Sequence, residues 1–234
     1  MRQKETKCVT AERLIDMVRK LMRKLIWGYK ADSDSYISHL KEKGAQIGGD
    51  VKIFSPAQTM IDMQAPYLLK IGSNVVMTGP VTILTHDYSA IVCEKLHQND
   101  ERAIASMLPV IIGDNVFIGW GATILPGTSI GSNTIIGAGA VVKGNIEANS
   151  VYAGNPAQRI SSIESFYNRR IHSQVEEAYN ICMNYMDRYG EMPEESAFHG
   201  YESLWKPAKY NNCKWNSFEE FCMHVRNRMG KQNY

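Results

Sequence analysis

Several features that mark other protein classes are missing from this sequence. No apolar run approaches the roughly 20 residues that a membrane-spanning helix needs. The N-terminal residues lack the apolar core and small-residue cleavage site of a secretory signal. The five cysteines (Cys8, Cys93, Cys182, Cys213 and Cys222) are odd in number and never form a C-x-x-C pair, which argues against a disulfide framework or a structural zinc site. We therefore expect a cytoplasmic protein without a membrane span.

The sequence also lacks a strong charge of either sign. The net charge of +2 is too small to indicate a nucleic-acid-binding protein. A hydrophobic fraction of 44% and a charged fraction of 21% are ordinary for a soluble globular protein. The exception is residues 1–30, which are basic around "RKLMRKLIW". We interpret this stretch as an amphipathic helix with a solvated basic face; the alternative is contact with an acidic membrane.

The two ends of the chain have helical patterns. From Ala11 to Tyr29, apolar residues recur with a period of 3.6, and a second short helix is expected from Ser35 to Lys43, before Gly44. Residues 161–234 are also expected to form a helical extension, in which Ser217 caps the last helix. The predicted organisation is therefore a helical segment at 1–44, a central domain at 45–160 and a helical extension at 161–234.

The central segment contains an internal repeat of six residues. Aliphatic residues stand six apart at Ile112, Ile118, Ile124, Ile130, Ile136 and Val142, and glycine follows most of them. An α-helix does not have this period, because six residues turn it through about 600° and leave the starting face. The pattern predicts short strands joined by tight turns, three to a coil, with glycine relieving the turns. Successive coils would stack at the strand spacing of about 4.8 Å.

Two stretches of this segment carry a family resemblance. "VFIGWGATILPGTSIGSNTIIGAGAVV", followed by "VYAGNPAQRI", resembles the hexapeptide-repeat acyltransferases, in particular the maltose, galactoside and capsular-polysaccharide O-acetyltransferases. The resemblance covers about residues 36–160. It implies an all-β core that is a left-handed parallel β-helix, with N-terminal helices and a helical C-terminal extension outside it. It also implies transfer of an acetyl group from acetyl-CoA, and homotrimers with active sites between subunits.

The repeat stops for more than twenty residues at an inserted loop, 85–109, that begins within "ILTHDYS". A regular β-helix has flat faces, so a loop is needed to make a cleft. His86 lies at the root of this loop and matches by position the general base of the family. A neutral imidazole is suited to remove the proton of an acceptor hydroxyl as that hydroxyl attacks a thioester. The transfer is expected to be direct, because nothing near Cys93 would activate it as a nucleophile.

Two carboxylates accompany the histidine as candidate substrate-binding residues. Asp62, in "MIDMQAPYLL", could bind sugar hydroxyls or orient His86 from another coil; it could also be an ordinary turn residue. Asp87 is the sequence neighbour of His86 and is an accessory candidate only, because a sequence neighbour need not orient the imidazole.

The resemblance also places the candidate contacts for coenzyme A. Ala138 and Gly139, in "IGAGAV", would offer backbone groups to the pantetheine arm. Trp120 stands where related sequences often carry a small polar residue; its ring would form a wall of the thioester or acceptor region, or pack at a subunit interface. Lys143 and Arg159 are the cations expected near the phosphates. Both are shifted by one position from the usual family pattern, which puts their individual contacts in doubt.

Several functions remain open at this point. The favoured one is O-acetylation of a saccharide or saccharide precursor. An antibiotic or a nucleotide-sugar amine is the alternative acceptor, and a non-catalytic β-helical assembly module is the alternative to an enzyme. The zinc enzymes of this fold need three converging histidines, and the repeat with its loop contains only His86 and His97, so no metal is expected.

Overall fold

The structure is a computed structural model, which describes residues 2–96, 105–206 and 215–232. The chain divides into two compact units, Met1–Ile163 and Glu164–Tyr234. The boundaries of the three predicted segments stay a prediction, since the structure groups the N-terminal helices and the central segment in one unit.

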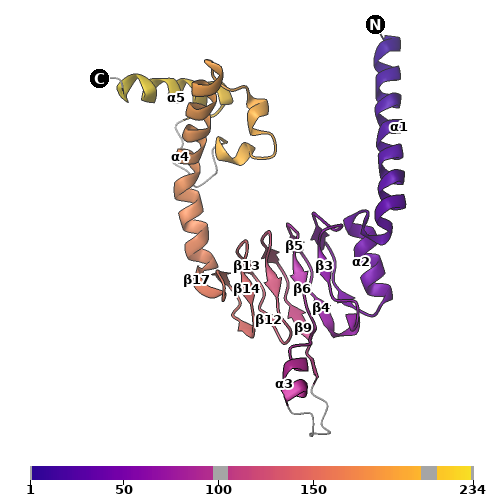
Figure 1. Cartoon of the computed structure of the whole chain (residues 1–234). Helices are drawn as coiled ribbons and strands as arrows, with labels where there is room; N and C mark the ends of the chain where they lie inside the picture. The colour runs from indigo at the N-terminus through magenta and orange to yellow at the C-terminus, as the bar shows by residue number, and fades with distance from the viewer. Residues whose placement is uncertain (1, 97–104, 207–214, 233–234) are drawn as a thin grey trace. The chain divides into compact units, whose positions relative to one another are not determined.

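The first unit begins with two α-helices, α1 (Arg2–Trp27) and α2 (Ser33–Glu42), joined by the 3-10 turn Gly28–Lys30 (Figure 1). The first helix starts nearer the N-terminus than its sequence pattern indicated. Asp32 caps the N-terminus of the second helix: its carboxylate accepts a hydrogen bond from the Ser35 backbone N–H at 2.8 Å. Such a cap satisfies a backbone donor that the first helical turn leaves unpaired.

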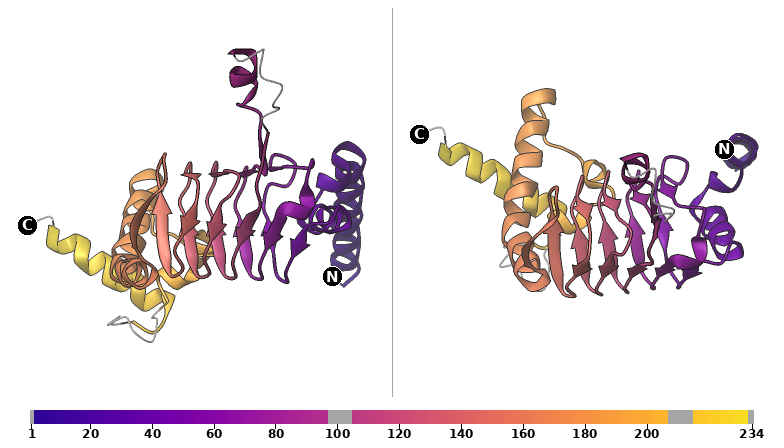
Figure 2. Two further views of the ribbon diagram at one scale, coloured as in Figure 1. Left: turned by 90° about the horizontal axis from the view of Figure 1, so that it is seen from below. Right: turned by 60° about the horizontal axis from the view of Figure 1, so that its bottom comes forward.

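The rest of the first unit is a parallel β-helix with three sheets, A, B and C, which the chain visits in turn (Figures 1 and 2). Sheet A contains β1 (Gln46–Ile47), β4 (Leu69–Ile71), β9 (Val110–Ile112), β12 (Ser129–Ile130) and β15 (Asn145–Ile146). Sheet B contains β2 (Lys52–Ile53), β5 (Val75–Met77), β10 (Val116–Ile118), β13 (Thr134–Ile136), β16 (Ser150–Ala153) and β17 (Gln158–Ser162). Sheet C contains β3 (Met60–Ile61), β6 (Thr82–Ile83), β11 (Thr123–Ile124) and β14 (Val141–Val142). The chain thus makes four complete coils and part of a fifth.

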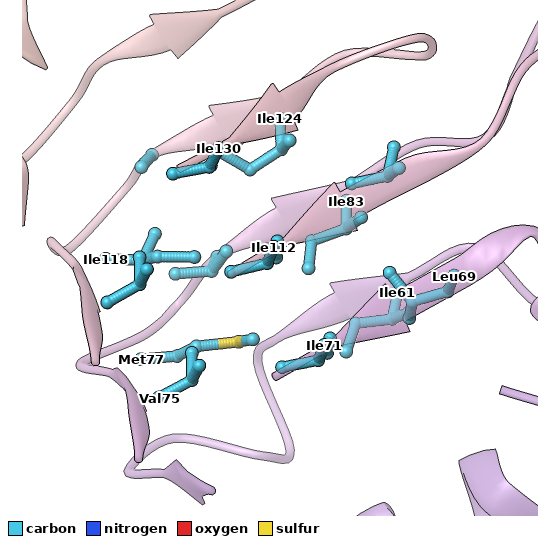
Figure 3. Close-up of a cluster of buried hydrophobic side chains, with 14 of the residues drawn as sticks. Ile61, Leu69, Ile71, Val75, Met77, Ile83, Ile112, Ile118, Ile124 and Ile130 are labelled. Carbon is cyan, nitrogen blue, oxygen red and sulfur yellow. The ribbon is translucent and has the colours of Figure 1, made fainter. Parts of the chain in front are cut away.

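Pairing between coils places equivalent repeat positions directly above one another. Ile83 pairs with Ile124, which in turn pairs with Val142, and the other two sheets follow the same rule. The aliphatic residue of each repeat therefore points inward and stacks on its counterpart (Figure 3). These side chains are almost completely buried, and burying each one contributes roughly 1.5–3 kcal/mol to folding. The six-residue period is the period of this internal stack.

Neighbouring structure covers both ends of the stack. At the first coil, Tyr36 and Leu40 of α2 are fully buried in the same apolar core, and the Tyr36 hydroxyl accepts a hydrogen bond from the Ile61 N–H. At the last coil, Tyr152 and Ala157 pack on the core, and β17 pairs antiparallel with β16. Covering the coil ends buries aliphatic residues that a bare β-helix would expose, and β17 pairs with the strand edge of β16.

The repeat glycines have a different role from the predicted one. Gly113, Gly119, Gly131 and Gly137 are not among the residues with positive φ, so they do not relieve a strained turn. At each of them, a Cβ atom would instead lie too close to the next coil; at Gly119 it would lie 2.6 Å from the Ala138 backbone nitrogen. The prediction that glycine relieves the turns is therefore wrong for these positions. Glycine is required there because the coils approach closely.

This close approach gives a stability prediction. Gly119→Ala should lower the free energy of unfolding by about 2–3 kcal/mol, because backbone must move to make room for the methyl group. The matched control is Gly49→Ala, since a Cβ at Gly49 meets no atom within 4 Å and its φ is not positive. Denaturant unfolding of both variants measures the difference. Equal stability of the two variants would contradict the role assigned to Gly119.

The second unit is helical. It contains α4 (Ile163–Tyr189, of which all but Ile163 belongs to this unit), the 3-10 turns Glu195–Phe198 and Glu202–Leu204, and α5 (Phe218–Gln232). The Ser217 side chain accepts a hydrogen bond from the Glu220 N–H at 3.2 Å, as expected of the predicted cap. A separate apolar cluster forms its core, with Tyr179, Phe198, Trp215 and Phe221 among its buried members. None of the described helices is long and apolar enough to cross a bilayer.

Candidate functional site

The inserted loop leaves the β-helix after sheet C of the second coil. It begins with β7 (His86–Asp87), continues into the short helix α3 (Ile91–Leu96) and returns through β8 (Ser106–Met107), which pairs antiparallel with β7. We call residues 86–107 the arm; residues 97–104 within it, including His97, lie outside the described residues. Its two ends are joined by a hydrogen bond from the Leu108 N–H to the Thr85 carbonyl oxygen at 2.9 Å. The described parts of the arm stand out from the stack of coils (Figure 2). His86 is the first residue of β7 and so lies at the root of the arm.

His86 is held by a carboxylate from the preceding coil. Ile61 pairs with Ile83, and this register carries Asp62 to the place where the chain turns from Leu84 into the arm. The Asp62 carboxylate oxygen Oδ2 is hydrogen-bonded to His86 Nδ1. Of the two functional roles that the sequence left open for Asp62, this contact favours orientation of His86. The Asp62 side chain is only 2% exposed, whereas that of His86 is 19% exposed and can be reached from solvent.

Asp62 is built into a set of hydrogen-bond donors. Its Oδ2 accepts from the Thr85 hydroxyl at 2.6 Å and from the Thr85 N–H at 3.1 Å, and its Oδ1 accepts from the Gln64 N–H at 2.9 Å. Burial by itself would raise the pKa of Asp62, but the hydrogen bonds from Thr85, Gln64 and His86 outweigh burial and lower the pKa to about 2. Asp62 is therefore ionised at neutral pH.

The ionised carboxylate decides which imidazole nitrogen carries the proton. A carboxylate accepts hydrogen bonds and donates none, so His86 Nδ1 must be the donor in their contact. In the neutral imidazole the other nitrogen, Nε2, is then unprotonated and has a free lone pair. A histidine fixed in this tautomer can accept a proton at Nε2.

Two further residues at the site were missed by the sequence analysis. The Tyr88 ring lies edge-on to the His86 ring, with centroids 4.6 Å apart, and its hydroxyl accepts a hydrogen bond from the Gln64 side chain. Tyr88 follows β7 directly and stands two positions after His86, a spacing that could have pointed to it because residues i and i+2 of an extended segment lie on the same side. Gln64 comes from another coil and gave no signal in the sequence.

Asp87 does not contact the imidazole in the same way. Its carboxylate accepts the Ser89 N–H at 2.7 Å, and this hydrogen bond is the main reason why the pKa of Asp87 is lowered. The positive charge of Lys143 lowers it further. The structure thus places Asp87 in the turn of the arm, and it places Lys143 close enough to interact with that turn electrostatically.

The candidate coenzyme A residues lie at two different corners of the coil. Trp120, Ala138 and Gly139 share the corner between sheets B and C, where the Gly139 N–H donates to the Trp120 carbonyl oxygen at 2.7 Å. His86 and Lys143 both follow strands of sheet C, at the corner between sheets C and A. Within one chain, sheet C therefore separates the predicted pantetheine contacts from the predicted base.

Arg159 occupies neither corner. It lies in β17, opposite Tyr152, and its guanidinium forms an ion pair with Glu147 at 3.3 Å. One chain therefore does not bring Lys143 and Arg159 together as a single phosphate site. Across the described ranges, the structure contains no group of three or more His, Cys, Asp or Glu side chains that could hold a metal ion.

Comparison with known proteins agrees with this architecture. A family profile described as the hexapeptide repeat of succinyl-transferase matches residues 109–143. Protein CapG of Staphylococcus aureus is 34% identical over 127 residues, and the match covers 54% of this chain and 71% of CapG. The chain belongs to the hexapeptide-repeat acyltransferase superfamily. The sequence-based prediction of a left-handed parallel β-helix with N-terminal helices and a helical C-terminal extension is confirmed.

Other members of the hexapeptide-repeat superfamily match over shorter stretches. The galactoside O-acetyltransferase of Escherichia coli K12 is 38% identical over 97 residues, which are 42% of this chain and 45% of that relative. Among solved structures, a maltose O-acetyltransferase from Clostridium difficile 630 is 29% identical, with a TM-score of 0.39 over 55% of this chain and 75% of that structure. The matched part of the chain thus spans less than half the length of the galactoside enzyme. The family relationship places the chain among acyltransferases.

Proposed function

We propose that the protein is an acetyl-CoA-dependent O-acetyltransferase that modifies a hydroxyl of a saccharide or saccharide precursor, with His86 as general base. The observation that carries this proposal is the Asp62–His86 pair at the root of the arm. A buried, ionised carboxylate fixes the imidazole so that Nε2 is free to accept a proton. The name of the galactoside O-acetyltransferase supports the choice of a sugar hydroxyl as acceptor.

The proposed reaction needs one proton acceptor and no covalent enzyme intermediate. The acceptor hydroxyl attacks the thioester carbonyl while its proton passes to His86 Nε2, and the new ester C–O bond forms as the tetrahedral intermediate develops. The C–S bond then breaks, and the proton on His86 passes to the departing thiolate. Asp62 stabilises the imidazolium present between these two proton transfers, and backbone N–H groups near the coil stabilise the oxyanion.

The separation of the two corners supports a homotrimer as part of the proposal. Trp120, Ala138 and Gly139 follow strands of sheet B, whereas His86 follows a strand of sheet C. A neighbouring copy that places its corner between sheets B and C beside the first copy's His86 would complete the site. Ala138 and Gly139 suit that position, because both are exposed and a Cβ at Gly139 would meet no atom within 4 Å.

The test is the release of coenzyme A thiol from acetyl-CoA, with saccharides, nucleotide sugars and hydroxyl-bearing antibiotics offered as acceptors. We expect turnover with one class of saccharide and none without an acceptor. Turnover only with an antibiotic or an amino sugar would replace the proposed acceptor. If no acceptor gives turnover and calorimetry detects no binding of coenzyme A, the protein is a β-helical assembly module and the proposal fails.

A further inference from the structure

The apolar face of α1 is uncovered along the whole part of the helix whose side chains the structure describes. From Leu14 to Trp27, the exposed fraction of every large apolar side chain lies between 50% and 81%. These side chains are Leu14, Ile15, Met17, Val18, Leu21, Met22, Leu25, Ile26 and Trp27. An apolar surface of this length in water is unfavourable, so it indicates a binding surface.

The arrangement of charge around this helix is specific. At 100° per residue, the apolar side chains other than Trp27 fall within about half of the helix circumference. The basic residues occupy the other half, and Arg19 and Lys24 lie at its two borders with the apolar face. Long basic side chains at these borders can extend toward anionic groups while their stems stay against apolar surface. This is the pattern of a helix that lies in the interface of a lipid bilayer.

The segment that carries this helix has a net positive charge, and the remainder of the chain has a net negative charge. Residues 1–30 contain nine Lys or Arg and three Asp or Glu, a charge of +6, whereas residues 31–234 contain 17 and 21, a charge of −4. An anionic surface would therefore attract the N-terminal segment and repel the remainder of the chain. The charge pattern thus favours contact through α1 alone.

A second copy of the chain explains the same face less well. Leu14, Val18, Leu21 and Leu25 have the spacing of a coiled-coil seam. The apolar face is wider than that seam, however, and pairing along it would leave Ile15, Met22 and Ile26 outside or at its edge.

We propose that α1 docks the protein on an anionic phospholipid surface, with its apolar face in the bilayer interface. The leucine and isoleucine side chains from Leu14 to Ile26 enter the boundary between headgroups and acyl chains, and the bordering residues Arg19 and Lys24 contact the lipid phosphates. The helix lies on the membrane and does not cross it.

The experiment is sedimentation of the full-length protein with phospholipid vesicles. We expect binding to phosphatidylcholine vesicles that contain about one third phosphatidylglycerol, and much weaker binding to phosphatidylcholine alone. Replacing both leucines, Leu21→Glu with Leu25→Glu, should lower binding at least about tenfold, while glutamate preserves the helix. Arg19→Gln and Lys24→Gln should each lower binding to the anionic vesicles about fivefold.

The matched control is Met223→Glu, because Met223 is also an exposed apolar residue on a helix, outside α1. This variant should bind vesicles like the unchanged protein. The proposal is overturned if the unchanged protein does not bind anionic vesicles, or if the double leucine variant binds equally well. The rival occupant of this face is a second copy of the chain, and ultracentrifugation without lipid tests for it. If the unchanged protein forms oligomers and does not bind vesicles, and the double leucine variant loses the oligomers, the face belongs to a second copy. None of these measurements depends on enzymatic activity.

Discussion

His86→Ala is expected to lower kcat for acetyl transfer about 10²–10⁴-fold, which is the usual contribution of a general base. The variant loses the group that accepts the hydroxyl proton, whereas the proposed coenzyme A contacts, Trp120, Ala138 and Gly139, are unchanged in it. The dissociation constant for coenzyme A should therefore stay within about threefold of its original value. Steady-state thiol release and calorimetry measure the two quantities.

The histidine prediction needs a control for the general effect of removing an imidazole. His172→Ala serves as this control, because His172 is an exposed residue of α4 in the second unit. The kcat of the His172→Ala variant should equal that of the unchanged protein. Thermal unfolding of His86→Ala should be measured as well, since the substitution removes one hydrogen-bond partner of the buried Asp62. A folded His86→Ala protein with near-normal kcat would rule out His86 as the base.

Asp62→Asn is expected to have the second-largest effect, a fall in kcat of roughly 10²–10³-fold. Asparagine keeps the size of the side chain but removes the negative charge that stabilises the imidazolium. In the unchanged protein the Gln64 N–H and the two Thr85 donors all donate to the carboxylate. The amide N–H₂ of asparagine would therefore face a donor, and at least one of these hydrogen bonds would be lost. The KM for acetyl-CoA should change little, since Asp62 is buried beneath His86.

A double variant distinguishes positioning of the base from general damage. If Asp62 acts through His86, Asp62→Asn combined with His86→Ala should be no slower than His86→Ala alone, within about threefold. Multiplied losses in the double variant would mean that Asp62 has a role independent of His86. The matched control is Asp50→Asn, because Asp50 has a positive φ and asparagine occupies the positive-φ positions 74, 115, 133 and 149. This control should retain full activity.

The arrangement of the site follows from how a β-helix positions side chains. Successive coils stack in register, so two residues that follow paired strands lie together although many positions separate them in the chain. Asp62 and His86 are 24 positions apart, and the pairing of Ile61 with Ile83 brings them into contact. Asp62 belongs to the rigid stack and His86 is the first residue of the arm, so the stack fixes the position of the imidazole through this contact.

The sequence by itself determined the repeat, its interruption and the histidine at the interruption. The six-residue period reports the burial of one side chain per strand, which is a local property repeated along the chain. The break at "ILTHDYS" is visible in the sequence because an inserted loop contributes no side chain to the core, so the six-residue spacing of aliphatic residues stops there. His86 could therefore be located without coordinates, and the family resemblance suggested its role as the base.

The tertiary structure alone decided which residues meet. Asp62 had three possible roles in the sequence, and only the stacking register shows that its carboxylate reaches the imidazole. The same register separates His86 from Trp120 and Ala138 within one chain. Likewise, a helical period shows that α1 has an apolar face, but not whether another part of the chain covers it. Contacts between coils and helices depend on distances across the fold, and a local pattern contains no information about those distances.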